Sequence, residues 1–308
     1  MALNQAAPNS LSNCQVSVSG ATGFVGSRLV EVCRNRGYPT NMIDFHGTTQ
    51  VQNRSLPIGD VFVHLSALAH ADNTDQGQVY SVNRDLAVSA AQAAKAVGYR
   101  QFVFLSSALV WGSSLDCVSL STPENPDTVY GRAKIEAEHA ITALETRDFH
   151  VIIVRPPLVY GSGVKGNLHK FLNAVYRWPV CPLGVSDNRR SMVNLDNLCE
   201  LILFLSIRAV SGTFCAMDSP PVSSYHVLKL MAARMPRHAR LLPMPQYLQS
   251  LLKIGAPFTA RRLLGSFVIE DDSVARVGFE PPFTMEQGFD AMVATYLAEQ
   301  GIEGNRSR

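Results

Sequence analysis

The sequence predicts an α/β protein built on a doubly wound parallel sheet, and three observations lead to this prediction. Short apolar runs that are typical of buried strands alternate with longer segments whose apolar residues recur at helical spacing. A glycine-rich turn joins the first of these strands to the first helix. Polar residues follow the ends of several strands, which is where open parallel sheets bind their ligands. With 308 residues, of which 46% are hydrophobic and 17% charged, the chain can bury a sizeable core.

The composition also argues against several classes of protein. The net charge is +2 and no run of lysine or arginine exceeds a pair, which indicates neither nucleic acid nor an anionic membrane as a partner. The six cysteines show no C-x-x-C spacing, so we expect free thiols in a reducing cytoplasm and no metal site. Residues 1–12 lack the features of a signal peptide and are expected to form a flexible tail. No apolar run approaches the roughly 20 residues of a spanning helix, so we expect no membrane insertion.

The glycine turn consists of Gly20, Gly23 and Gly26. It follows the alternating pattern of Val16 and Val18, which is typical of a strand end, and it precedes an amphipathic helical pattern. Glycines let backbone N–H groups approach a diphosphate closely, and the positive end of the next helix points at the same charge. The turn therefore predicts a dinucleotide site. Its spacing, G-x-x-G-x-x-G, is one residue longer than the usual fingerprint, so an ordinary glycine turn remains an alternative on this motif alone.

A second strand is predicted over residues 40–44, with Asp44 at its end. Asp44 lies eighteen residues after Gly26, close to where dinucleotide-binding folds place the acid that binds the adenosine ribose. A carboxylate there would repel a 2′-phosphate, which predicts NAD in preference to NADP. The alternative is an acid that merely ends a strand. Residues 45–59 are polar and leave room for one weak strand.

The next strands are predicted at residues 61–65 and 102–105, separated by a helix that Gly98 ends. His64 and His70 follow the first of these, and without acidic or cysteine neighbours they are interpreted as structural. Further along, a strand over 213–217, a helix from 223 to 235 and a capping box of Thr284 and Gln287 before the last helix complete the scaffold.

Tyr130 and Lys134 form the chemical centre of the prediction. At positions i and i+4 they share one face of a helix that begins after Thr128. Tyr130 lies 23 residues after Ser107, which follows the end of a strand. A phenol has a pKa of about 10, and a nearby ammonium is expected to lower it. Tyr130 could then exchange a proton near neutral pH while Ser107 hydrogen-bonds the same substrate oxygen.

Four segments together resemble the extended short-chain dehydrogenase/reductases, the sugar-nucleotide epimerase/dehydratase group. They are Ser19–Gly26, Ser107, Tyr130 to Lys134, and Arg155-Pro-Pro-Leu-Val-Tyr-Gly161. The resemblance runs from about residue 15 to 296. It implies a Rossmann-type NAD(P)-binding domain over 13–165 with a return strand near 190–217. It also implies a smaller, interleaved α/β substrate-binding part over 166–300, followed by a tail at 301–308.

The resemblance also implies the roles of individual residues. Ser107, Tyr130 and Lys134 would be catalytic, Lys134 would also contact the nicotinamide ribose, and Asn83 would support the cofactor side of the sheet. The expected NAD contacts are Gly20, Thr22, Gly23, Phe24, Val25, Gly26, Asp44, Leu65, Ser66, Ala67, Asn83, Tyr130, Lys134 and Pro157.

The expected partner is a UDP-sugar. Asn167 matches the asparagine that contacts the diphosphate in relatives, Arg189 matches their phosphate-binding arginine, and Arg262 resembles a second clamp. Arg189 could instead be a solvated surface charge. Two departures stand out. The family's Asp-Ile or Asp-Val pair that holds adenine is not recognisable, which leaves the adenine contacts unassigned, and Trp111 replaces a tyrosine, which could reshape the sugar pocket.

Three reactions of the family use the same serine, tyrosine and lysine: 4-keto reduction, C4 epimerisation and 4,6-dehydration. Dehydratases carry an Asp-Glu pair directly after the active-site hydroxyl, whereas Ala108 and Leu109 follow Ser107 here, which disfavours dehydration. The remaining motifs most resemble reductases of UDP-2-acetamido-2,6-dideoxy-4-hexulose in bacterial surface-polysaccharide synthesis. UDP-glucose or UDP-N-acetylglucosamine 4-epimerases are the alternative, and a non-catalytic NAD(P)-sensing protein is a more distant one. The resemblance also allows a homodimer.

Overall fold

The structure is a computed structural model. It describes residues 14–45, 47–48, 50–51, 56–69, 75–184, 187–237, 239–255, 260–261 and 264–302, with the side chains of 182–184 left out. The tail predicted at 1–12, His70, Arg262 and residues 303–308 of the predicted C-terminal tail lie outside the described residues.

A six-stranded parallel sheet forms the centre of one half of the molecule, in the order β10-β6-β4-β3-β1-β2. The strands are β1 (Val16–Ser19), β2 (Thr40–Ile43), β3 (Val61–His64), β4 (Gln101–Leu105), β6 (His150–Arg155) and β10 (Gly212–Cys215). The order reverses between β1 and β3, and ligands of open α/β sheets bind at such a switch point. No strand is present among the described residues of 45–59, so β2 stands at the edge of the sheet.

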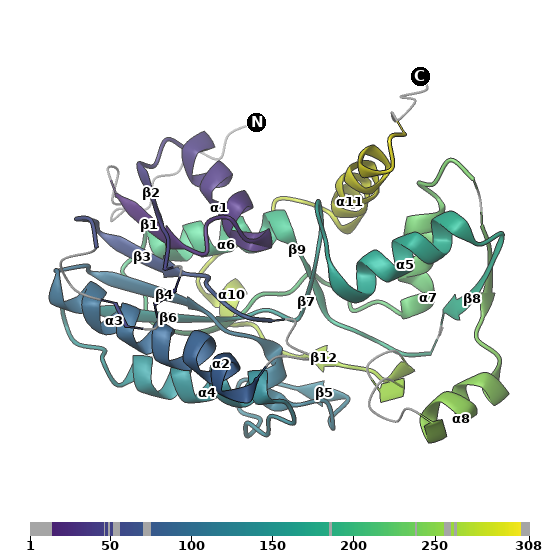
Figure 1. The fold of residues 1–308 in the computed structure, drawn as a ribbon, viewed down its shortest axis with the longest axis horizontal. Coiled ribbons are helices and arrows are strands. Elements are labelled where there is room, and N and C mark those ends of the chain that lie inside the picture. Colours follow the sequence, from purple (N-terminus) through teal and green to yellow (C-terminus); the bar gives the residue numbers. More distant parts are fainter. Residues whose placement is uncertain are drawn as a thin grey trace.

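Helices cover both faces of this sheet (Figure 1). On one face lie α1 (Phe24–Asn35) and α6 (Leu195–Ser206), and on the other lie α2 (Gln76–Tyr80), a π-helical turn (Ser81–Asp85), α3 (Leu86–Ala96) and α4 (Val129–Thr142). Successive strand residues point to opposite faces, so β3 sends Val61 and Val63 to the first core and Phe62 to the second. Alanines of α3 leave room for the phenylalanines of the second core. The doubly wound α/β class is confirmed.

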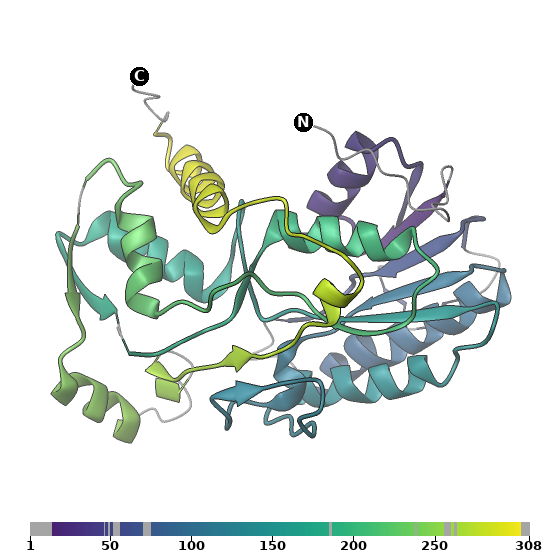
Figure 2. The same ribbon diagram turned by 180° about the vertical axis from the view of Figure 1, so that it is seen from behind.

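The remaining elements gather beyond the carboxyl ends of the strands (Figures 1 and 2). They include α5 (Gly166–Arg177), α7 (Ser224–Ala232), α8 (Gln246–Gly255) and α11 (Met285–Glu299), whereas α10 (Ser273–Arg276) packs against β10. Three short parallel pairs accompany them: β7 (Leu158–Tyr160) with β9 (Met192–Asn194), β8 (Val180–Gly184) with β11 (Arg240–Pro243), and β5 (Cys117–Val118) with β12 (Val268–Ile269). A separate apolar core holds α5, α7 and α11 together.

The late elements follow the sequence pattern closely. The capping box of Thr284 and Gln287 is present at the start of α11, and α7 begins after Ser223 but ends at Ala232, three residues before the expected end. None of the six cysteines, all of which are described, forms a disulfide bond. In the part of the chain that is described, no helix combines the length and apolarity needed to cross a bilayer.

Candidate active site

The glycine turn is held in close contact with the segment that follows β3. Gly20 has a φ of +69°, and a Cβ atom there would lie 2.7 Å from the backbone nitrogen of Ser66. At Gly26 a Cβ atom would lie only 2.0 Å from the carbonyl oxygen of Gly20. Both positions therefore require glycine, because any side chain would collide with backbone. The result is a tight cradle at the switch point between β1 and β3.

The cradle fits the diphosphate of a dinucleotide. Gly23 is the N-cap of α1 and contributes no side-chain hydrogen bond, and the first turn of α1 contains no acidic residue. Backbone N–H groups and the positive end of the helix dipole are thus directed at this point. Thr22 is exposed, while Phe24 and Val25 are partly buried against the core and anchor the start of α1.

Asn83 fixes the other side of the cradle. The side chain is fully buried, and its Oδ1 atom accepts a hydrogen bond from Leu68 N at 3.1 Å while Nδ2 donates to Leu68 O at 3.3 Å and to Val79 O at 2.9 Å. The π-helical turn places it there. These bonds hold the loop that contains Leu65, Ser66 and Ala67 next to Gly20, although Asn83 itself is closed off from solvent.

Asp44 lies at the same edge of the sheet. It directly follows Ile43, which pairs with Ser19, and Ser19 precedes Gly20. The residue is exposed. The expected arrangement of an acid beside the glycine turn is therefore present, in a position from which a carboxylate can accept hydrogen bonds from a ribose.

Ser107 and Tyr130 come from different elements that are packed tightly against each other. Thr128 caps α4 by accepting a hydrogen bond from Gly131 N at 3.0 Å, and a Cβ atom on Gly131 would lie 2.6 Å from Leu109 O. Leu109 N in turn donates to Ser107 Oγ at 3.2 Å. The absence of a side chain at Gly131 thus lets the first turn of α4 approach the segment after β4. Ser107 and Tyr130 are both partly exposed there.

Lys134 lies one turn further into α4 and is 1% exposed. Its Nζ atom donates to Leu105 O at 2.9 Å and lies 4.4 Å from the centre of the Phe104 ring and 5.8 Å from that of the Tyr130 ring. Burial lowers the pKa of Lys134 to about 7, an effect that the nearby Glu138 carboxylate partly opposes. At a distance of 5.8 Å from the Tyr130 ring centre, the ammonium can interact with a negative charge on the phenol.

The expected lowering of the Tyr130 pKa is wrong for this structure. Burial raises the pKa of the Tyr130 phenol, because its charged form is poorly solvated. The spacing in the chain reveals the Lys134 ammonium near Tyr130, but it does not reveal that the folded protein removes water from around the Tyr130 phenol. As a consequence, Tyr130 keeps its proton at neutral pH and is suited to donate it.

A buried ionic network lies behind Lys134, and the sequence reasoning missed it. Glu138 accepts hydrogen bonds from Arg155 Nη2 at 2.7 Å and Nε at 3.1 Å, and also from the Ser106 hydroxyl. Arg155 Nη2 also contacts Glu124 at 2.9 Å. Tyr130, Lys134 and Glu138 are spaced by four residues on α4, which was the available signal, since such residues share one helical face.

Trp111, expected to reshape the sugar pocket, is instead part of the interior. Its side chain is 0% exposed, its Nε1 atom donates to Thr122 O at 3.1 Å, and the Arg155 guanidinium lies 4.8 Å from its ring centre. The indole therefore supports the network through a cation–π contact. Pro157 follows β6 and is partly buried.

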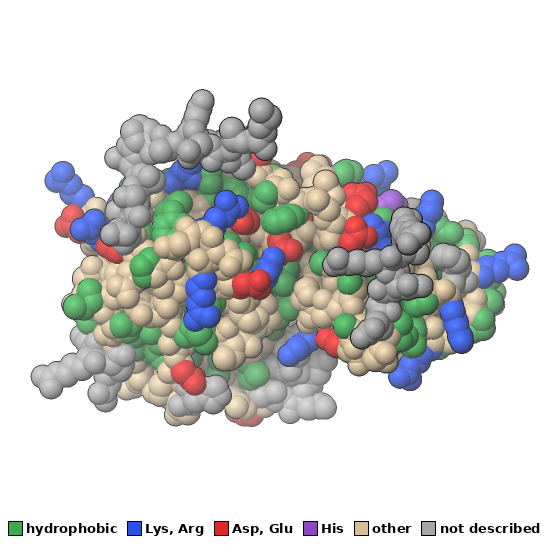
Figure 3. Space-filling view, turned by 90° about the horizontal axis from the view of Figure 1, so that it is seen from above, with side chains coloured by type: hydrophobic (Ala, Val, Ile, Leu, Met, Phe, Trp, Pro, Cys, Tyr) green, Lys and Arg blue, Asp and Glu red, His purple; other side chains and the backbone are tan. Residues whose placement is uncertain are grey.

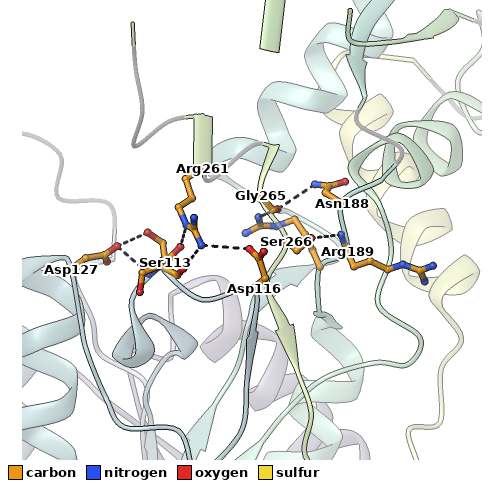
Figure 4. Close-up of polar contacts among 10 residues, drawn as sticks. Ser113, Asp116, Asp127, Asn188, Arg189, Arg261, Gly265 and Ser266 are labelled. Atoms are coloured by element: carbon orange, nitrogen blue, oxygen red, sulfur yellow. Dashed lines mark hydrogen bonds and ion pairs between the residues drawn. The ribbon is translucent and has the colours of Figure 1, made fainter. Parts of the chain in front are cut away.

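Asn167 and Arg189, two of the three residues expected to bind the sugar diphosphate, lie on different segments and are both exposed. Asn167 is exposed in the first turn of α5, and Arg189 is exposed beside β12, where its backbone bonds to Ser266 Oγ at 3.1 Å and to Phe267 N at 2.7 Å. Figure 4 shows the Arg189 side chain pointing away from Arg261. Arg262 lies outside the described residues. Its neighbour Arg261 donates to the carbonyl oxygens of Ser113 and Ser114 and lies 3.4 Å from Asp116.

Comparison with models of protein families shows to which family the chain belongs. The NAD dependent epimerase/dehydratase family model matches residues 16–214, which include the glycine cradle, Ser107, Tyr130 and Lys134. The chain belongs to this family. It is therefore an NAD-dependent enzyme of the group that acts on sugar nucleotides.

Two similar proteins are named as epimerases, and one structure of similar fold is named as a reductase. The chain is 27% identical to a UDP-glucose 4-epimerase of Vibrio cholerae, over 92% of this chain and 95% of the relative. It is 23% identical to N-acetyl-alpha-D-glucosaminyl-diphospho-ditrans,octacis-undecaprenol 4-epimerase of Escherichia coli O157:H7, over 90% and 94%. The fold resembles that of a dTDP-4-dehydrorhamnose reductase of Clostridium acetobutylicum with a TM-score of 0.74 and 17% identity, covering 93% of this chain and 99% of that one.

Proposed function

We propose that this enzyme reduces the C4 keto group of a UDP-2-acetamido-2,6-dideoxy-4-hexulose, with NADH as the reductant. The observation that carries the proposal is the placement of Tyr130 on a helix packed against the Ser107 segment, with the buried Lys134 ammonium 5.8 Å from its ring centre. A reduction needs an acid at the carbonyl oxygen, and a protonated tyrosine provides one.

In this reaction Ser107, Tyr130 and Lys134 would each have one task. The chemistry that NADH would supply when bound is the hydride that adds to C4. The Ser107 hydroxyl hydrogen-bonds the C4 oxygen and orients it, and the Tyr130 phenol donates its proton to that oxygen. The Lys134 ammonium, 5.8 Å from the phenol ring, stabilises the phenolate that remains until solvent returns a proton.

The same proposal assigns the binding residues. The N–H groups at Gly23 and the first turn of α1 would bind the NAD diphosphate, and Asp44 would bind the adenosine ribose, with NAD preferred over NADP. Arg189 and Asn167 would bind the UDP diphosphate, since a guanidinium forks onto phosphate oxygens. The exposure of both side chains supports their access to a ligand.

A 4-epimerase acting on UDP-glucose or UDP-N-acetylglucosamine is the second candidate. The Vibrio cholerae relative named for that activity aligns with 92% of this chain, which favours this candidate on sequence. The same three side chains would serve it, with Tyr130 first accepting the proton of the sugar hydroxyl and later returning it to the C4 oxygen. A protein that only senses NAD is disfavoured because both Tyr130 and Lys134 are present.

The two reactions differ in how they use the cofactor. A reductase consumes one reduced cofactor per product, whereas an epimerase regenerates its nicotinamide in every cycle. We expect the absorbance of NADH to fall in proportion to product when the enzyme receives UDP-2-acetamido-2,6-dideoxy-4-hexulose. Conversion of UDP-glucose or UDP-N-acetylglucosamine to its C4 epimer without any loss of NADH would instead identify an epimerase.

A further inference from the structure

Helix α8 presents an apolar stripe to solvent. Tyr247, Leu251 and Ile254 recur at helical spacing and are 70%, 62% and 81% exposed. No residue of α8 is buried, although Leu252, on another side of the helix, packs against a small apolar cluster that contains Met244. An isolated exposed leucine is ordinary, but a continuous exposed stripe on one helix marks a surface that meets an apolar partner.

The chain around this stripe carries charge of a single sign. Residues 219–269 contain no aspartate or glutamate. Their basic residues are Lys229, Arg234, Arg237, Arg240, Lys253, Arg261 and Arg262. Because the whole chain has a net charge of only +2, the rest of it is net acidic, and the modest total hides a strongly basic segment.

Several of these cations are available to a partner. Arg234 is paired with Asp290 and Arg261 with Asp116, whereas Arg237, Arg240 and Lys253 are exposed and form no ion pair with any described residue. Seen from above, the end of the molecule that contains α5 and α7 shows many lysine and arginine side chains and few acidic ones (Figure 3). This view is taken from the side opposite α8, so basic side chains are also present on the face of this end that lies away from α8 (Figures 1 and 3).

We propose that α8 docks the enzyme on the surface of a bilayer that contains anionic lipids. A helix of this kind lies in the plane of the interface, with its apolar side at the boundary of headgroups and acyl chains. Tyr247 suits that boundary because its ring is apolar and its hydroxyl is polar. Lys253 and Arg240 would contact lipid phosphates, and each basic side chain near such a surface adds to the attraction. The inference does not depend on which reaction the enzyme catalyses.

Docking through α8 would bring the loop of residues 113–116, which follows Ser107 in the chain, close to the membrane surface. In Figures 1 and 2, α8 and β5 lie along the same edge of the molecule. Beyond α8, Arg261 contacts the loop of residues 113–116, which lies shortly after Ser107. A membrane-bound enzyme could thus meet substrates, or deliver products, at the bilayer surface.

Co-sedimentation of the full chain with vesicles tests the proposal. We expect binding to vesicles of phosphatidylethanolamine and phosphatidylglycerol, weak binding to pure phosphatidylcholine, and a loss of binding when salt is raised from about 0.05 to about 0.5 M, which shortens the range of the attraction. The double variant Leu251→Gln, Ile254→Gln should bind at least about tenfold more weakly. Ile58→Gln is the matched control, because Ile58 is 87% exposed but belongs to the sheet-containing half, and it should bind like the unmodified enzyme.

Several outcomes would overturn the proposal. These are no binding to the anionic vesicles, and equal loss of binding in the α8 double variant and the Ile58 control. A third is a dimer in analytical ultracentrifugation that the double variant dissociates while vesicles bind neither protein, since α8 would then be an interface between two copies. Activity with a soluble substrate should be the same in the double variant and the unmodified enzyme, so a failure of docking is distinguishable from a failure of the proposed reaction.

Discussion

Replacing Glu138 by glutamine should destabilise the fold and alter the active site together. The carboxylate is buried, and Arg155 donates to its Oε2 at 2.7 and 3.1 Å and to its Oε1 at 3.2 Å, while the Ser106 hydroxyl donates to Oε1 as well. A glutamine has one acceptor oxygen, so its amide NH₂ would face a donor, and Arg155 would retain only the partly exposed Glu124. Breaking a buried ion pair in this way costs about 3–5 kcal/mol of unfolding free energy.

Chemical denaturation followed by fluorescence would measure this loss, with Glu136→Gln as the control. Glu136 lies on the same helix, but its contact with Arg84, at 2.8 Å, is at the surface, where ion pairs contribute about 0–1 kcal/mol. The Glu138 carboxylate also raises the pKa of Lys134, so its removal should move any Lys134-dependent limb of the pH–rate profile to lower pH. A Glu138→Gln protein as stable as Glu136→Gln, with an unshifted profile, would refute this account of the network.

Three further predictions concern the reaction itself. Tyr130→Phe should lower kcat by about 10²- to 10⁴-fold while the affinity for NADH, measured by fluorescence titration, stays nearly unchanged; near-normal turnover would mean that another group donates the proton. Asp44→Ala should weaken NADH binding and narrow the preference over NADPH, and a wild-type preference for NADPH would contradict the role of Asp44. The rate of reduction should fall as pH rises through about 7, because Lys134 loses its proton there while Tyr130 keeps its own; a rate that rises over this range would exclude the assigned protonation states.

The fold and the cofactor cradle could be predicted from the sequence because they depend on patterns of residues that are close together in the chain. Gly20 and Gly26 indicate a turn in which two backbone segments are in direct contact. The alternation of strand and helix patterns predicts a parallel sheet, for which few topologies are possible. The spacing of Tyr130 and Lys134 was equally informative, since four residues on a helix define a common face. The room for one weak strand between 45 and 59 is not used by any described residue of that segment, and the sheet ends at β2.

The properties that escaped the sequence depend on tertiary burial. The residues near Tyr130 in the chain do not show how much water its phenol loses on folding. The predicted direction of its pKa shift was therefore wrong. Arg155 and Glu138 belong to a strand and a helix whose packing creates their pairing. Trp111 likewise could be placed in the interior only once its neighbours were known. The basic segment 219–269, whose charged side chains are all Lys or Arg, was readable from the sequence, but the solvent exposure of Tyr247, Leu251 and Ile254 beside it was not.

The fate of the hydride tests the central claim most directly. The enzyme would be given UDP-2-acetamido-2,6-dideoxy-4-hexulose and NADH that carries deuterium in its transferable position, and the product would be analysed by mass spectrometry and NMR. A C4 reductase predicts one deuterium per product molecule, located at C4, with an equal amount of NAD formed. A product without deuterium at C4, formed while the labelled NADH remains intact, would contradict the account.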